Sequence, residues 1–446
     1  MTDGKLIRRA LAAAFCGLAF AGTTATCVGQ ATFEGAPIRY LDGQPCNRVA
    51  ELQARSEAGT LPCEYDARRG YLPALLKLLD IDPATQMLVF SKTSFQLRLI
   101  APQTPRALYF NDDVYVGYVP GGDVTEISVA DPQFGAVFYT VDQAPATGMR
   151  FVRRTHECLQ CHSSSVTQGV PGHLVRSVFP DREGHPILRA GSFVTTHESP
   201  FAQRWGGWYV TGTHGQQQHM GNSTMERGAR EDQFDRSAGA NVTDLNAFCD
   251  VTPYMQPHSD LVALMVLEHQ SHVHNLITAA NFQTRLALHD ERVINEMLGR
   301  PQGEHSASTL RRIRNASEKL VEGLLLSREA TLQSPVSGTS DFARAFSARG
   351  PRDSQGRSLR DFDLQRRLFK YPCSYLVYSA AFDGLPAEAK DCVYQRLEAI
   401  LTAPVTSDQF VHLSADDRRA VREILRETKP EFVQAGAQAN AGPQVK

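Results

Sequence analysis

The sequence predicts an α+β fold with a β-rich N-terminal half and an α-helical C-terminal third. Short runs of β-branched and aromatic residues, separated by Pro, Gly and Asp, follow one another between residues 87 and 141. This pattern is typical of strands in a sheet. After Pro257 the apolar residues recur with the period of packed helices. The chain has 446 residues, which is enough for two or three domains.

A helix is expected before the first strand. Apolar positions within residues 70–79 have helical spacing, inside a segment, 30–85, that is otherwise rich in loops. These elements and the strands after them would form one module in the first third of the chain. The expected strands are 87–90, 95–100, 107–119, 125–129 and 136–141, with further candidates at 187–196 and 207–213.

Five helices are expected after Pro257. Ser259 can cap the first of them, with Asp260 in its first turn, and Ser414 can cap the last. Residues 333–361 are rich in Ser, Gly, Arg and Pro and are expected to form a long loop. The expected helices span 259–288, 308–331, 363–381, 386–403 and 415–428.

These patterns divide the chain into five parts. The last part has no apolar periodicity and is expected to be a disordered tail. The parts are a signal peptide (1–25), an N-terminal helix with a β-sheet module (26–145), a His-rich region (146–256), a helical domain (257–433) and the tail (434–446).

The N-terminus has the three parts of a secretory signal. Basic residues up to Arg9 precede an apolar run at 10–21, and small residues suit cleavage near Ala25. The apolar run is too short to span a bilayer, so we expect a cleaved signal and no transmembrane anchor. Cys27 could carry a lipid, but the residues before it fit a lipobox poorly, and a lipoprotein is not favoured. The expected location is periplasmic or secreted.

In an oxidising compartment the remaining cysteines are candidates for disulfide bonds. Cys46 and Cys63 bracket a loop and are the pair that we expect. Cys373 and Cys392 are a second possible pair, which would leave Cys249 unpaired. Sequence alone does not fix this connectivity.

The segment with the most specific chemistry is C-L-Q-C-H at residues 158–162. A C-x-x-C-H run is the attachment motif of a c-type haem, in which two thiols bond to the haem and the histidine ligates its iron. A zinc site would need a second Cys/His pair, and the chain has no other C-x-x-C. The motif therefore predicts one covalent haem c, attached at Cys158 and Cys161, with His162 as the proximal iron ligand.

Residues on both sides of the motif can support a haem. Arg153 and Arg154 directly precede it and can pair with haem propionates, although a solvated basic face is the alternative. Pro171 and Gly172 resemble the turn whose backbone carbonyl holds the Nδ1 atom of a proximal histidine, here His162. An ordinary surface turn is the alternative for that pair.

Histidines are concentrated around the motif, since 11 of the 14 lie between residues 156 and 274. This bias indicates ligand or proton chemistry. Met220 lies in a Gly-flanked loop of this region and is the sixth iron ligand that we favour. The alternative for Met220 is an ordinary core residue. The competing ligands are His219, His214 and His173.

A second constellation lies on the first C-terminal helix. Glu268 and His272 are four residues apart and face the same side of the helix, with His269 next to Glu268. The three are candidates for a metal site or for an acid/base pair in a distal pocket. Histidines that serve as hydrogen-bonded core donors are the alternative.

Several segments along most of the mature chain resemble a group of large bacterial proteins that contain a cytochrome c domain with one haem motif. The resemblance implies covalent haem and secretion, and it supplies no substrate and no catalytic residue. It is carried by residues 89–96, 109–118, 158–162, 169–173, 204–215, 219–222, 257–260, 268–270 and 371–375.

Two functions from different classes fit these residues. The favoured one is a periplasmic monohaem cytochrome that transfers electrons to or from a redox partner protein. The alternative is a haem oxidoreductase, peroxidase- or oxidase-like, which acts on a small-molecule substrate with the His and Glu residues as distal groups. A haem-based sensor or binding module is a third option. The formal net charge of −2 gives no basic surface for nucleic acid.

Overall fold

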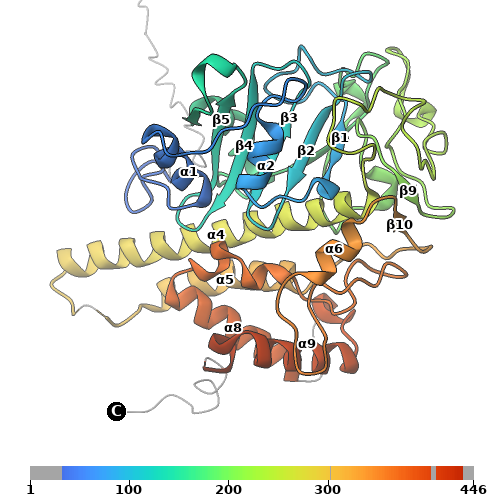
Figure 1. The fold of residues 1–446 in the computed structure, drawn as a ribbon. Coiled ribbons are helices and arrows are strands. Elements are labelled where there is room, and N and C mark those ends of the chain that lie inside the picture. The colour runs from blue at the N-terminus through green and yellow to red at the C-terminus, as the bar shows by residue number, and fades with distance from the viewer. Residues whose placement is uncertain (1–32, 302, 403–407, 435–446) are drawn as a thin grey trace, which may run out of the picture.

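The computed structural model of the chain describes residues 33–301, 303–402 and 408–434. It confirms the α+β class, with an antiparallel sheet in the N-terminal half and helices in the C-terminal region (Figure 1). The predicted signal peptide, Cys27 and the tail from residue 435 lie outside the described residues.

The N-terminal half is built on a six-stranded meander, in which each strand pairs antiparallel with the next one in the chain. Two helices, α1 (Arg48–Glu57) and α2 (Leu72–Leu78), precede it. The last strand lies beyond residue 145, where we expected the sheet module to end. The strands are β1 (Met87–Val89), β2 (Arg106–Phe110), β3 (Val114–Tyr118), β4 (Val124–Asp131), β5 (Gly135–Asp142) and β6 (Phe151–Arg154).

Two of the strand predictions differ from the structure. The strand expected at 95–100 is wrong, because this segment is a series of turns in which Phe95, Leu97 and Leu99 are exposed and only Ile100 is buried. The single run expected at 107–119 is a hairpin of β2 and β3. The side chain of Asn111 accepts hydrogen bonds from the backbone N–H groups of Asp113 and Val114, which is a standard way to stabilise a turn.

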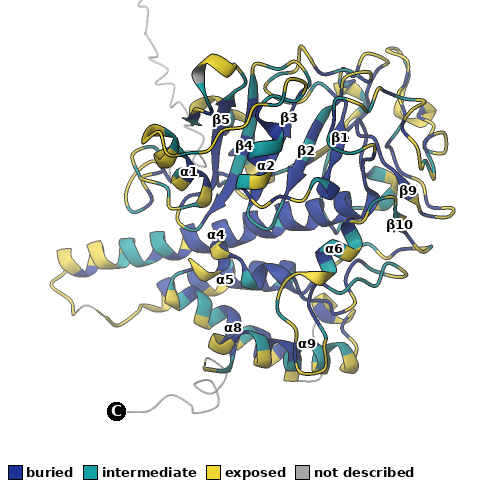
Figure 2. Ribbon diagram, in the orientation of Figure 1, coloured by how far each residue is buried: buried dark blue, intermediate teal, exposed yellow. Residues whose placement is uncertain are grey.

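The strands of the sheet are mostly buried or half-buried (Figure 2), and the two faces of the sheet differ in burial. On β4, Thr125, Ile127 and Val129 are buried, and they alternate with Glu126 and Ser128, which are half-buried. This alternation follows from the two-residue period of a strand. The first face packs on the N-terminal segment with α1 and α2, and the other face carries both buried and half-buried side chains.

Short elements follow the sheet. Helix α3 (His156–His162) begins directly after β6 and carries the C-x-x-C-H motif. Strands β7 (Val175–Val178) and β8 (Ser192–Thr195) form a hairpin, and β9 (Gly212–Thr213) pairs with β10 (Ser337–Gly338).

The C-terminal region is organised around α4, which lies between the sheet and the other helices (Figure 1). Asp260, and not Ser259 as predicted, caps α4 by accepting from the N–H groups of Val262 and Ala263. The Ser259 hydroxyl instead binds backbone groups of Leu88 and Tyr209. The helices are α4 (Leu261–Met297), α5 (Ala307–Leu324), α6 (Phe342–Ala348), α7 (Ala380–Asp383), α8 (Ala387–Thr402) and α9 (Ala415–Thr428).

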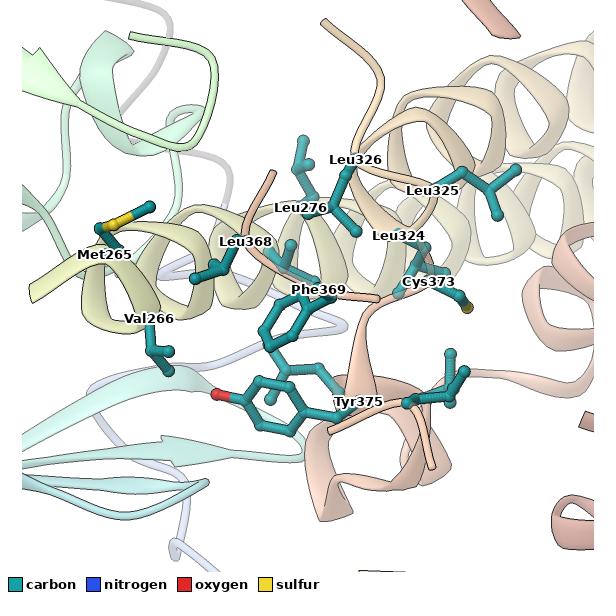
Figure 3. Packing of buried hydrophobic residues seen from close by; sticks show 14 of the residues in the cluster. Met265, Val266, Leu276, Leu324, Leu325, Leu326, Leu368, Phe369, Cys373 and Tyr375 are labelled. Atoms are coloured by element: carbon teal, nitrogen blue, oxygen red, sulfur yellow. The ribbon is translucent and has the colours of Figure 1, made fainter. Parts of the chain in front are cut away.

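Two predictions after α5 are wrong. The helix expected at 363–381 is replaced by turns, a short 3-10 helix (Tyr375–Tyr378) and α7, because Asp363 accepts from the backbone N–H groups of Gln365 and Arg366 and Pro372 lacks an N–H. The loop expected at 333–361 contains α6. The apolar residues of this region still reach the core, where Leu368, Phe369 and Tyr375 pack against α4 (Figure 3).

The predicted disulfide bonds do not form, because each cysteine in the described part of the chain is a free thiol. The backbone N–H of Cys46 donates to Asp131 at the end of β4. Cys63 instead lies beside the Tyr71 hydroxyl. Cys373 is buried in the core, whereas Cys392 lies on α8.

No helix in the described ranges combines the length and apolar character that a membrane crossing requires.

Candidate functional site

The motif residues lie on one short helix at the edge of the sheet. Leu159 is buried in the core and anchors α3, while Cys161 is exposed and Cys158 is half-buried. Burial raises the pKa of Cys158 to about 11, and the nearby Glu126 carboxylate adds to this effect. The thiol of Cys158 is therefore protonated at neutral pH.

His162 is held by the turn that follows it in the chain. Its Nδ1 atom lies 2.9 Å from the carbonyl oxygen of Gly172, and the N–H of Gly172 donates to the carbonyl of His162 at 2.8 Å. The predicted contact between this turn and His162 is confirmed. A carbonyl can only accept, so Nδ1 carries the proton and the lone pair is on Nε2. Desolvation lowers the pKa of His162, which favours this neutral form. No hydrogen bond from the described residues reaches Nε2.

The turn is fixed in place from α4. The Asn275 side chain accepts from the N–H of His173 at 2.8 Å and donates to its carbonyl at 2.7 Å. The Asn275 amide packs so closely that a Cβ atom on Gly172 would lie 2.3 Å from its Oδ1 atom. Thr167 donates to the Val170 carbonyl at 2.8 Å at the start of the turn. Position 172 therefore requires glycine for space.

The face of the sheet that carries Phe138 lies against the motif. The Phe138 ring centroid is 4.9 Å from that of His162. Because Phe138 pairs with Ser128 on one side and Arg154 on the other, all three side chains lie on this face. The Arg154 side chain donates to Thr140 at 3.1 Å and lowers the pKa of the Cys158 thiol.

Arg153, one residue earlier, points to the opposite face. Its guanidinium donates to the carbonyls of Gly43 at 2.7 Å and Tyr40 at 2.6 Å, and it lies over the Tyr40 ring at 5.4 Å. The two arginines that the sequence grouped together are thus separated by strand alternation. Arg154 is near the motif, and Arg153 holds the N-terminal segment.

An ion pair that the sequence did not predict lies near the motif. Arg106 on β2 and Glu126 on β4 approach to 2.6 Å, and both side chains are mostly buried. Their charges have opposite effects on the pKa of His162. No sequence signal could have found this pair, because only the strand register brings the two residues together.

Hydrogen bonding restricts two of the alternative sixth ligands. The Gly221 N–H donates to Nδ1 of His219 at 2.9 Å, and the Asn241 N–H donates to Nε2 of His214 at 2.9 Å. A backbone N–H can only donate, so in each neutral ring the other nitrogen carries the proton. Burial lowers the pKa of His219 to about 3 and also lowers that of His214, which keeps both rings neutral. Neither histidine presents a free lone pair to a metal.

Met220 lies in a cluster separate from that of the motif helix, whereas His173 lies near His162. Met220 is fully buried, and its sulfur lies 3.7 Å from the Ser177 hydroxyl, in a cluster separate from the one that contains α3. The His173 ring lies against Tyr115 and Phe138, and Phe138 in turn contacts the His162 ring. The Nε2 atom of His173 is 2.5 Å from the Ser128 hydroxyl. The members of the Met220 cluster are Phe179, Ile187, Met220, Met225 and Phe234.

The predicted acid/base residues on α4 do not meet at the motif. Glu268 is buried and paired with Arg204 at 3.0 Å, and burial raises the pKa of Glu268 to about 7. His272 lies 3.8 Å from Glu198, and burial lowers its pKa to about 4. None of the residues that pair with Glu268 or His272 contacts His162.

His269 lies close to His272 on α4, since the rings of both contact the ring of His197. Its Nε2 atom is 2.8 Å from the Ser374 hydroxyl, its Nδ1 atom is 3.2 Å from Nδ1 of His197, and burial lowers its pKa to about 3. The α4 residues that do approach the motif are Gln270, His274 and Asn275, through Tyr115 and His173. Of these, only His274 belonged to the histidine-rich signal in the sequence.

No protein-family model, curated protein or solved structure matches this chain.

Proposed function

We propose that this chain is a periplasmic monohaem c-type cytochrome that acts in electron transfer. Haem is attached at Cys158 and Cys161, and His162 is the proximal ligand. The observation that carries the proposal is the state of His162, whose Nδ1 atom is bonded to the Gly172 carbonyl while its Nε2 atom has no partner among the described residues. A proximal histidine needs this tautomer, and the carbonyl bond increases its basicity.

The other motif residues fit covalent haem. Cys158 and Cys161 are free thiols, and they lie on the same helix as His162. Arg154 lies on the face of the sheet that contacts His162, where its charge suits a propionate. Bound haem supplies a centre that gains and loses one electron. Because Cys161 is exposed, a group attached to it stays within reach of a redox partner protein.

A haem oxidoreductase is the second candidate, and one observation favours it. His214 and His219 offer no free lone pair, and Met220 packs in a separate buried cluster. An iron with no sixth protein ligand can bind a peroxide or oxygen, whereas a Met or His ligand gives an electron carrier. The candidate distal residues of the sequence, Glu268 and His272, have partners elsewhere.

The test is haem incorporation followed by spectroscopy. The full chain is produced with haem-maturation machinery, and a pyridine haemochrome assay should give one covalent haem per chain, with loss of attachment in a variant that carries Cys158→Ser and Cys161→Ser. A chain without this signal would refute the haem proposal.

The ferric spectrum then separates the two functions. A low-spin spectrum with a Met–iron charge-transfer band that disappears in Met220→Ala supports the carrier. A high-spin spectrum that changes on addition of peroxide supports the oxidoreductase instead.

A further inference from the structure

A buried tyrosine near the motif has a base as its hydrogen-bond partner. Tyr115 on β3 is 8 % exposed, and its hydroxyl oxygen lies 2.8 Å from Nδ1 of His274 on α4. The side-chain amide of Gln270 donates to the same hydroxyl oxygen at 3.0 Å. The Tyr115 hydroxyl thus has the Gln270 amide, the Ser271 side chain and one ring nitrogen, Nδ1 of His274, as hydrogen-bonding neighbours.

The direction of the hydrogen bond between Gln270 and Tyr115 is fixed by the other partners of the Gln270 amide. The Gln270 amide nitrogen also donates to the Asn111 carbonyl at 2.7 Å, and the Gln270 oxygen accepts from the Tyr375 hydroxyl. The amide orientation is therefore determined, and Gln270 can only donate to Tyr115. Because Gln270 cannot accept from Tyr115, the phenolic hydrogen is available for donation to Nδ1 of His274.

Because Tyr115 is buried, we expect it to lose its electron and its proton together. Desolvation raises the pKa of Tyr115 far above its usual value, so the phenolate is not present at neutral pH. Desolvation also lowers the pKa of His274 to about 3, so its ring is neutral, and in the tautomer with the proton on Nε2 the Nδ1 atom accepts from Tyr115. After proton transfer the phenolic oxygen would keep the hydrogen bond from Gln270.

This arrangement distinguishes Tyr115 from the other tyrosines in the described part of the chain. Where those hydroxyls donate to an oxygen, the acceptor is a carbonyl, amide or hydroxyl oxygen, which is a poor proton acceptor, and the Tyr71 hydroxyl also lies beside the Cys63 thiol. Tyr109, on the adjacent strand, is an example, because its hydroxyl donates to the Gln86 side-chain oxygen at 2.7 Å. The others with such bonds are Tyr40, Tyr71, Tyr209, Tyr254, Tyr375 and Tyr378.

Aromatic contacts connect Tyr115 to the motif. The Tyr115 ring lies 4.3 Å from the His173 ring, measured between centroids. The centroid of Phe138 is 6.4 Å from that of His173 and 4.9 Å from that of His162. Electron transfer slows steeply with the gap between groups, and these contacts keep each gap short.

We propose that Tyr115 is a redox-active residue that gives one electron to the haem centre while its phenolic proton moves to Nδ1 of His274. The proposal rests on covalent haem at His162, and it names a hydroperoxide as the oxidant. With hydrogen peroxide, bound reduced haem would supply one electron and Tyr115 the other. The peroxide takes up two protons from solvent, its O–O bond breaks, and it leaves as two molecules of water. Tyr115 ends as a neutral radical, and His274 holds the phenolic proton.

The experiment uses the haem-loaded full chain, reduced and then mixed with hydrogen peroxide and frozen. Electron paramagnetic resonance should show a tyrosyl radical, identified by its altered splitting in protein grown with ring-deuterated tyrosine. In Tyr115→Phe, which keeps the ring contact with His173, this signal should disappear. In His274→Leu, which removes the proton acceptor, radical formation should slow at least tenfold.

The matched control is Tyr109→Phe, which removes a buried hydroxyl from the adjacent strand and should leave the radical yield unchanged. Absence of a pyridine haemochrome signal refutes both the haem proposal and this one. A haem-loaded protein that forms no tyrosyl radical, or that forms the same radical in Tyr115→Phe, refutes the role of Tyr115 alone.

Discussion

Replacement of Asn275 by leucine tests how His162, the proposed proximal ligand, is held. The Asn275 side chain satisfies both the N–H and the carbonyl of His173, and the adjacent Gly172 carbonyl bonds to Nδ1 of His162. Leucine has a similar size but cannot form either hydrogen bond. It would leave two buried backbone groups unpaired, at a cost of about 1–3 kcal/mol each. We therefore expect Asn275→Leu to lower the free energy of unfolding by about 2–6 kcal/mol.

The same substitution should change the properties of His162. If the turn shifts, the hydrogen bond to Nδ1 weakens and the imidazole becomes a less basic ligand, which disfavours the ferric state. The reduction potential should then rise, and a tenfold change in the one-electron equilibrium corresponds to about 59 mV. Nitrogen NMR of the haem-free chain gives a separate measurement, since the protected Nδ1–H signal of His162 should be lost.

Asn281→Leu is the matched control for this experiment. Asn281 lies on the same helix, is similarly buried, and donates to the carbonyls of Pro132 and Gly384 at 3.0 Å each. It makes no hydrogen bond to the turn at 171–173. Both variants should therefore lose stability, but only Asn275→Leu should change the potential and the NMR signal. Equal changes in the two variants, or no change in either, would refute the positioning role of Asn275.

Three further predictions concern single residues. Gly172→Ala should reduce haem incorporation, measured by pyridine haemochrome, because the new Cβ atom would lie 2.3 Å from a side-chain oxygen on α4; normal incorporation would contradict this. Arg154→Leu should change the haem reduction potential with little effect on the free energy of unfolding. Arg153→Leu should instead lower the free energy of unfolding by about 2 kcal/mol, because two hydrogen bonds are lost, and should leave the potential unchanged. The reverse result would overturn the assignment of the two arginines to opposite faces of the sheet. Burial raises the pKa of Glu268 to about 7, above its value of about 4.3 in unfolded chains. The contribution of Glu268 to the free energy of unfolding is complete below about pH 4 and is lost as the pH rises through about 7. The free energy of unfolding of Glu268→Gln should therefore depend less on pH across this range. An unchanged pH dependence would argue against a raised pKa.

The sequence predicts those features of the site that depend on local spacing. The C-x-x-C-H motif needs only one helical turn, and the turn at 171–172 follows it closely enough for the chain itself to bring the Gly172 carbonyl to His162. The fold class is predictable for a similar reason, because strand and helix periods are local. Predictions failed where turn chemistry competed with apolar periodicity, as at Asp363, whose side chain binds the next backbone N–H groups.

The residues of α4 show why the rest of the site could not be predicted. Helical spacing places Glu268 and His272 on one side and Gln270 and His274 on another, since two residues correspond to about 200° of rotation. The sequence does not say which side faces the motif. The contact with the sheet decides this, because Tyr115 on β3 binds Gln270 and His274. The number of histidines pointed to α4, but the packing of that helix brings Gln270, His274 and Asn275 toward the motif in place of Glu268 and His272.

The arrangement around His162 also explains why the motif lies within a large chain. A small cytochrome would hold its proximal histidine with residues close in sequence, whereas here the turn behind His162 is fixed by Asn275 from the C-terminal helical region. The same helix supplies His274 as the partner of Tyr115. A movement of α4 relative to the sheet would therefore act on the orientation of His162 and on the Tyr115 hydrogen bond together. Since α4 also packs against α5 and the residues around Tyr375, the stability of the helical region and the properties of the proposed haem centre are coupled through a single helix.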